Sequence, residues 1–230
     1  MLRHAPPSWV YFGGFVLTLI AGAINAVGFL GQHHQALSHM TGSVTVLGLE
    51  LARANYGAAF HALAILAAFF TGCLISGVTI SQSSLRLGRR YGVALSLEAF
   101  ALFSAVFFLR HGASLGDYLA ALACGLQNAM VTTYSGSTMR TTHMTGMVTD
   151  LGIACGHLIR GTPVDWFRFR IYGFLFLGFF AGGVVGTFGY GHFGYDTLLF
   201  PAVLSGITGV GYTLVKHYEH RRHPTRRQAT

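Results

Sequence analysis

Two copies of one short polar motif carry most of the chemistry that this sequence offers. The run His39-Met40-Thr41-Gly42 recurs as His143-Met144-Thr145-Gly146. An imidazole donates or accepts hydrogen bonds and changes its charge near neutral pH, and a glycine lets a solute or another backbone approach closely. If each motif opens a helix, the unpaired first-turn N–H groups favour an anion or a polar neutral solute. The motifs therefore predict a site for a small solute, although each histidine could instead tie a turn to a neighbouring helix.

Polar residues within apolar stretches are the remaining candidates. Asn25 and Asn128 precede the two motifs and could line a solute route or satisfy loose backbone groups. Glu98 and Asp150 are carboxyls in apolar surroundings, where an unpaired charge is costly, so proton coupling and a static pair with an arginine or histidine both stay open. The predicted substrate-binding residues are His39, Thr41, Gly42, His143, Thr145, Gly146, Asn25 and Asn128.

The composition is that of a membrane protein. Of 230 residues, 52% are hydrophobic and 10% charged, whereas about a quarter of the residues in a soluble domain are charged. No polar stretch separates two cores, so residues 1–230 are expected to form a single membrane domain. The cysteines lack metal-ligand spacing, and no phosphate loop or nucleophile elbow occurs, so we expect no cofactor and no metal.

Six segments have the length of about 20 mostly apolar residues that a membrane-crossing helix needs. The first is too long for the core of a signal peptide and lacks an Ala-x-Ala cleavage signal, so we expect it to be retained. The six segments run from about Trp9 to Leu30, Phe60 to Ile80, Tyr91 to Leu109, Leu115 to Tyr134, Ile171 to Tyr190 and Tyr195 to Val215.

The chain repeats itself with an offset of 103 to 104 residues. The ten residues from His39 match those from His143 at eight positions, and Gly22 with Asn25 matches Gly125 with Asn128. Repeat 1 covers about residues 9–110 and repeat 2 about 115–216, and residues 217–230 form a basic tail. A repeat of this size in a membrane protein is typical of transporters and channels, although it could also have a structural origin alone.

The helix that follows each motif is too short to cross the membrane. Residues from Thr41 to Ala54 and from Thr145 to Ile159 would span only about 21 Å, less than the roughly 30 Å hydrocarbon core. We therefore predict an all-α membrane protein with six transmembrane helices, two re-entrant half-helices and two inverted repeats. The two motifs would then meet near the midplane.

Loop charge gives this arrangement an orientation. Lys and Arg collect on the cytoplasmic side, and the group of arginines at 86, 89 and 90 together with the basic tail would lie there in the six-span arrangement. If both short helices crossed instead, the chain would have eight spans and parallel halves, with fewer basic residues inside. Both termini are therefore expected in the cytoplasm, and the tail is expected to touch anionic lipid rather than nucleic acid.

The paired motifs, each preceded by Asn25-Ala26 or Asn128-Ala129, resemble the YoaK family of bacterial membrane proteins over about residues 9–215. The resemblance implies a bacterial inner-membrane protein with about six spans. It implies no substrate, cofactor or catalytic residue.

The sequence thus favours a transporter or channel for a small solute, with the bilayer and that solute as partners and a homo-oligomer left open. A membrane-embedded enzyme acting on a lipid or quinone, with His39 and His143 as acid and base, is the first alternative. It is disfavoured because no nucleophile or metal set accompanies these histidines. A structural or regulatory partner of another membrane protein is the second alternative.

Overall fold

The structure is a computed structural model that describes residues 8–80, 89–135 and 139–222, and all regular structure in these ranges is helical. The all-α prediction is therefore confirmed for the described residues. The elements in chain order are α1 (Ser8–Leu30), α2 (Met40–Ala52), α3 (Tyr56–Thr79), α4 (Arg89–Arg110), α5 (Leu115–Tyr134), α6 (Met144–Ile159), α7 (Trp166–Phe193), the short 3-10 helix η1 (Gly194–Leu198) and α8 (Leu199–Arg222).

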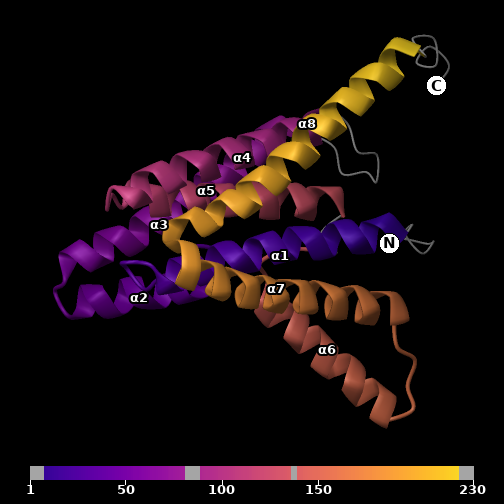
Figure 1. Cartoon of the computed structure of the whole chain (residues 1–230). Coiled ribbons are helices and arrows are strands. Elements are labelled where there is room, and N and C mark those ends of the chain that lie inside the picture. The colour runs from indigo at the N-terminus through magenta and orange to yellow at the C-terminus, as the bar shows by residue number, and fades with distance from the viewer. Residues whose placement is uncertain (1–7, 81–88, 136–138, 223–230) are drawn as a thin grey trace.

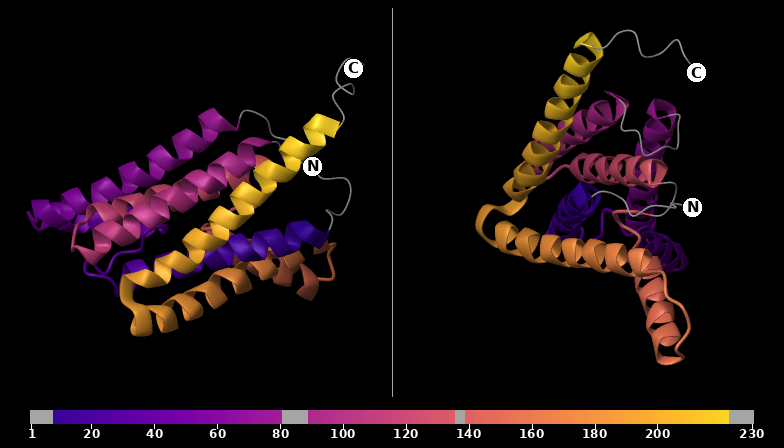
Figure 2. Two further views of the ribbon diagram at one scale, coloured as in Figure 1. Left: turned by 45° about the horizontal axis from the view of Figure 1, so that its top comes forward. Right: turned by 90° about the vertical axis from the view of Figure 1, so that its right-hand side faces the viewer.

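The long helices pack in pairs that join segments distant in the sequence. α1 packs against α7, α3 against α5, and α4 against both α5 and α8, as Figures 1 and 2 show. The amino end of α1 and the carboxyl end of α8 lie at one end of the molecule (Figure 1). We call the opposite end, which carries the α2–α3 turn, the α4–α5 turn and η1, the distal end.

Glycines let the paired backbones approach closely. A Cβ at Gly22 would overlap the carbonyl oxygen of Phe179 on α7, and one at Gly125 would overlap that of Phe69 on α3. Gly72 and Gly182 make the reciprocal contacts on α5 and α1. The small residues therefore specify which helices pair, as they do in membrane interfaces generally.

Each short helix packs on the long helix that follows it in the chain. α2 contacts α3 and α6 contacts α7, and α6 diverges from α7 toward its carboxyl end (Figure 1; Figure 2, right). Asn55 and Asp165 cap the starts of α3 and α7, because their side chains accept hydrogen bonds from the N–H groups of Ala58 and Arg168. The connections after α2 and α6 are therefore sharp turns rather than continuations.

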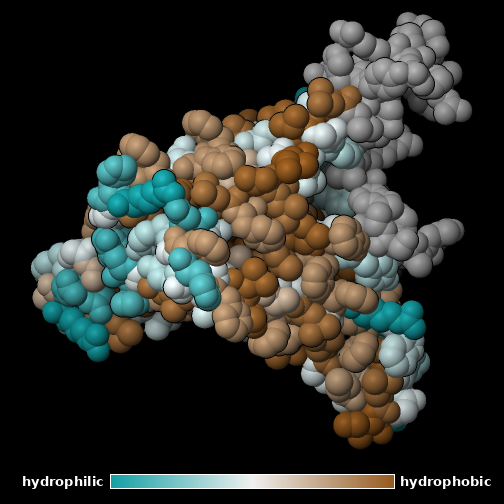
Figure 3. Space-filling model, viewed as in Figure 1, coloured by the Kyte–Doolittle hydropathy of each residue, from teal (hydrophilic) through white to brown (hydrophobic). Residues whose placement is uncertain are grey.

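The outer surface is apolar along the helices and polar at the distal end. Large side chains such as Phe60, Phe100, Phe180 and Ile207 are at least 62% exposed, and the brown surface in Figure 3 gives way to teal at the left, distal end. A face of this kind matches lipid tails rather than water.

By length and apolar composition, four described stretches are able to cross a membrane, fewer than the six expected. Two differences explain this. α7 and α8 form one apolar stretch, Trp166–Leu214, in which η1 makes the turn. α5 is absent from the four because Asp117, Gln127 and Asn128 lower its hydropathy, although the first two are buried in the bundle. The loop with Arg86 and the tail beyond Arg222 lie outside the described residues.

Candidate functional site

Asn25 holds the chain that returns toward α1 before the first motif. It is buried five residues before the end of α1, and its Oδ1 accepts hydrogen bonds from the backbone N–H of Ser38 at 3.2 Å and from its hydroxyl at 3.0 Å. A Cβ at Gly28 would lie 2.7 Å from the carbonyl oxygen of Gln35, so the returning segment lies directly on α1. Because Ser38 is bonded to a residue five positions before the end of α1, it lies beside the helix about 8 Å back from that end, at 1.5 Å per residue.

The second half contains the same arrangement. Asn128, six residues before the end of α5, accepts hydrogen bonds at Oδ1 from the N–H groups of Thr141 at 3.0 Å and Thr142 at 3.4 Å. The Thr141 hydroxyl donates to the same oxygen at 3.5 Å. Both asparagines therefore bond the residue 13 positions later. Of the two roles that the sequence offered for them, these bonds correspond to satisfying loose backbone groups.

The histidines lie at the starts of the two short helices, as the motifs predict. His39 and His143 are the N-cap residues of α2 and α6, both are exposed, and neither makes a capping hydrogen bond with its side chain. Each ring instead covers the glycine three residues on. A Cβ at Gly42 would lie 2.8 Å from His39 Nδ1, and one at Gly146 would overlap the His143 ring.

The first turns of α2 and α6 keep donor groups that their own helices do not use. The first backbone bonds run from Ser43 N–H to the His39 carbonyl and from Met147 N–H to the His143 carbonyl. The motif residues that stand before Ser43 and before Met147 therefore have backbone N–H groups with no acceptor within their own helix. The hydroxyl of Ser38, the residue before His39, is donated to Asn25. Thr41 and Thr145 are exposed beside these turns.

The two motif helices do not pack against each other. No Cα atom of α2 lies within 8 Å of one in α6, and each short helix contacts the long helix that follows it, α2 with α3 and α6 with α7. A shared site at the midplane would have to form between the starts of the two helices without direct helix packing, and it stays a prediction.

Glu98 lies in the interior of the helix bundle with neutral partners. Its exposure is 0%, and its Oε1 accepts hydrogen bonds from Gln127 Nε2 at 3.0 Å and Ser205 Oγ at 3.1 Å, while Oε2 has no hydrogen-bond partner. The expected ion pair with an arginine or a histidine is therefore absent from Glu98's described contacts. A charge here would lack a counter-ion, at a large cost in free energy.

Asp150 is an exposed residue of α6 and lies beside Tyr172 of α7. Among the described ion pairs, Arg53, the C-cap residue of α2, binds Glu50 of that helix rather than Asp150 or Glu98. The two carboxyls that the sequence singled out thus have different surroundings, one buried among α4, α5 and α8 and one on the surface.

A polar cluster at the distal end was missed by the sequence interpretation. His33, His61 and Asp117 place one ligand-type atom each within 4.8 Å of the others. They come from the segment after α1, from α3 and from α5. The sequence could have singled out His61 and Asp117 individually, since each stands at the start of a predicted span, but it gave no sign that they meet His33.

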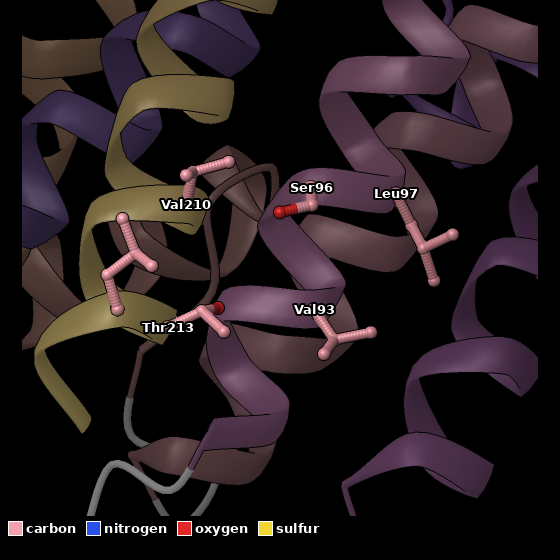
Figure 4. A pocket seen from close by; sticks show the side chains of 6 residues that line it. Val93, Ser96, Leu97, Val210 and Thr213 are labelled. Atoms are coloured by element: carbon pink, nitrogen blue, oxygen red, sulfur yellow. The ribbon is translucent and has the colours of Figure 1, made fainter. Parts of the chain in front are cut away.

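An apolar groove of about 300 Å³ runs between α4 and α8 (Figure 4). Its lining consists of Val93, Ser96 and Leu97 from α4 and Val210, Thr213 and Leu214 from α8. Such a lining offers few polar groups to orient a solute, so the groove is a packing feature rather than a solute site.

Comparison with known proteins agrees with a membrane location. A family described as "Protein of unknown function (DUF1275)" matches residues 13–211. The UPF0700 transmembrane protein YoaK of Bacillus subtilis (strain 168) is 32% identical over 89 residues, which cover 38% of this chain and 40% of that protein. No solved structure matches. The family match covers the motifs, both asparagines and Glu98, and the chain therefore belongs to the DUF1275 family of membrane proteins.

Proposed function

We propose that the chain carries a small polar or anionic solute across the bacterial inner membrane, as a transporter or channel, past two half-sites formed by the starts of α2 and α6. The observation that carries this proposal is the paired arrangement at Asn25 and Asn128. In each case an amide oxygen holds a non-helical segment beside a long helix, and a short helix begins there with an uncapped amino end. Non-helical backbone at membrane depth is tolerated where it is buried in protein or lines a water-filled cavity.

The proposed architecture has six crossing helices, with α2 and α6 as half-helices that enter and leave on one side. Support comes from the reciprocal glycine contacts of α1 with α7 and α3 with α5, which two inverted copies of one unit would generate. Both termini would face the cytoplasm. α2 would then open to the distal side and α6 to the cytoplasmic side.

Each half-site is proposed to consist of one histidine, one threonine, one glycine and the anchoring asparagine. His39, Thr41, Gly42 and Asn25 form the first, and His143, Thr145, Gly146 and Asn128 form the second. The positive end of the helix dipole and the free N–H groups favour a negative or strongly dipolar solute. Glu98 lies in the bundle interior, where it could take up and release a proton during transport.

The proposal requires water to reach the starts of the short helices. Thr41→Cys and Thr145→Cys, made after replacing Cys73, Cys124 and Cys155 by Ala, should react with a small charged thiol reagent in proteoliposomes. Phe100→Cys, on a 70% exposed position of α4 that the lipid tails would cover, is the matched control. If neither threonine position reacts faster than the control, both helix starts face lipid and the proposal is wrong.

Flux gives the second measurement. Wild-type proteoliposomes are compared with protein-free liposomes for nitrate, formate, urea and glycerol by light scattering after an osmotic shift. We expect faster equilibration of at least one of these solutes, and we expect His39→Phe and His143→Phe to slow it. His111→Phe, in the α4–α5 turn, should leave it unchanged. Equal flux in all these variants would show that His39 and His143 do not contribute to solute passage.

A further inference from the structure

The distal end contains a compact group of two histidines and one aspartate. Asp117 Oδ2 lies 2.8 Å from His33 Nδ1 and 3.9 Å from His61 Nε2. The two imidazole rings stack with their centroids 4.0 Å apart, so both present a nitrogen to the same carboxylate oxygen. Three separate segments of the chain thus converge on one point.

The hydrogen bonds among these three residues leave one buried nitrogen, His61 Nε2, without a partner. Asp117 is 7% exposed and His61 is 8% exposed, so both are shielded from water. His33 is within hydrogen-bond distance of the carboxylate, but His61 Nε2 is buried and has no hydrogen-bond partner. A buried polar atom without a partner is costly, and two imidazole nitrogens facing one carboxylate form a ligand set that a cation would complete.

We propose that His33, His61 and Asp117 bind a divalent first-row transition-metal ion of the Zn²⁺ class at the distal end. Imidazole nitrogen and carboxylate oxygen suit such ions. Ligand-to-metal distances of about 2.0–2.2 Å place neighbouring ligand atoms a little over 3 Å apart. The present separations of 2.8 and 3.9 Å fall on either side of that value, so small side-chain shifts suffice.

Neighbouring side chains already orient the two imidazoles. The Tyr118 hydroxyl lies 3.1 Å from His61 Nδ1, which leaves Nε2 for the ion. The Ser114 hydroxyl oxygen lies 3.4 Å from His33 Nε2 and can accept its proton, which leaves Nδ1 for the ion. Outer-shell partners of this kind accompany metal-binding histidines and set which nitrogen binds.

The surroundings fit an accessible site rather than a closed one. The His33 side chain is 28% exposed, so the ion has an entry path from the distal side. Three protein ligands leave at least one position for water or a substrate group. Among the described ion pairs, Arg110 pairs with Asp196, whereas Asp117 pairs with His33 and His61. A bound ion would fasten the segment that leads from α1 to Ser38 onto α3 and α5.

Metal binding is independent of the proposed transport and is measured directly. The full chain is purified without a polyhistidine tag and with the tail residues His217, His220 and His223 replaced by Asn. Zn²⁺ is then titrated in competition with a chromophoric chelator. We expect one ion per chain. Affinity should fall by more than the roughly 10- to 100-fold that loss of an outer-shell partner costs in His61→Ala and Asp117→Asn, and it should be unchanged in His111→Ala.

Two further measurements keep the outcome decisive if His61→Ala does not fold. Tyr118→Phe removes only the outer-shell hydroxyl and should weaken Zn²⁺ binding about 10-fold or more. Co²⁺ added to the wild-type chain should give the intense visible absorption of low-coordinate nitrogen and oxygen ligation, and Asp117→Asn should abolish it. Wild-type protein without a stoichiometric ion, or a titration that is the same in Asp117→Asn and wild type, would overturn the proposal.

Discussion

Asn25 and Asn128 each hold a returning segment through a single side-chain oxygen. Because the N–H group of Ser38 is buried against Asn25, removing the amide leaves that donor without a partner. The same reasoning applies to Thr141 and Asn128. These two amides are therefore the residues at which the half-sites are most sensitive to a conservative change.

Asn25→Ala should lower the free energy of unfolding by about 1–3 kcal/mol, the cost of an unsatisfied buried donor. Ser38→Ala should cost less, because the backbone N–H bond to Asn25 remains. Chemical denaturation in detergent of the two single variants and the double variant gives the coupling between them. A double variant equal to the sum of the singles would mean that the hydrogen bond from the Ser38 hydroxyl to Asn25 adds nothing.

Glycine within the motifs has a different role from glycine one turn or more later. Gly42→Ala and Gly146→Ala should displace the histidine rings that cover these positions and reduce transport. Gly48→Ala and Gly152→Ala have open space around the new methyl group. They should stabilise their helices by up to about 1 kcal/mol and leave transport intact. Flux and thermal unfolding of the four variants distinguish the ring contact from helix propensity, and equal flux in all four would contradict it.

Among the helices, glycine contacts determine which pairs form. Gly72→Ala and Gly182→Ala should each destabilise the fold by about 1–3 kcal/mol, as overpacking does, because the added methyl group meets a backbone carbonyl of the partner helix. Gly77→Ala and Gly183→Ala, on the same two helices, meet nothing within 4 Å and should be tolerated. Thermal unfolding in one detergent compares the four. Similar melting temperatures for all four would show that the close backbone approach is not needed.

Much of the element order could be predicted from the sequence, because apolar length and the paired motifs are local signals. α2 and α6 begin at Met40 and Met144, one residue before the predicted starts. Two features could not be predicted in this way. The pairing of α1 with α7 and the gathering of His33, His61 and Asp117 depend on contacts between distant segments, which no local pattern encodes. The expected meeting of the two motifs near the midplane stays a prediction.

At the scale of the whole molecule, the distal end and the end with the termini should lie on opposite sides of the membrane. In a chain without its native cysteines, His111→Cys at the α4–α5 turn should react with an impermeant reagent outside intact cells. Thr162→Cys, after α6, and Ser84→Cys, in the arginine-containing loop, should react only after permeabilisation. Labelling of Ser84→Cys from outside would favour eight spans with parallel halves.

The low hydropathy of α5 has a consequence for biogenesis. Alone in lipid this helix would expose Asp117 and Gln127, yet in the folded chain both are buried, with α3 and α4 packed against it. α3 and α4 precede α5 in the chain, so a nascent polypeptide presents the covering helices before the helix that needs them. We therefore expect α5 to enter the bilayer only in contact with α3 and α4. Substitutions that damage the α3–α5 contact should be seen first as degradation of newly made protein.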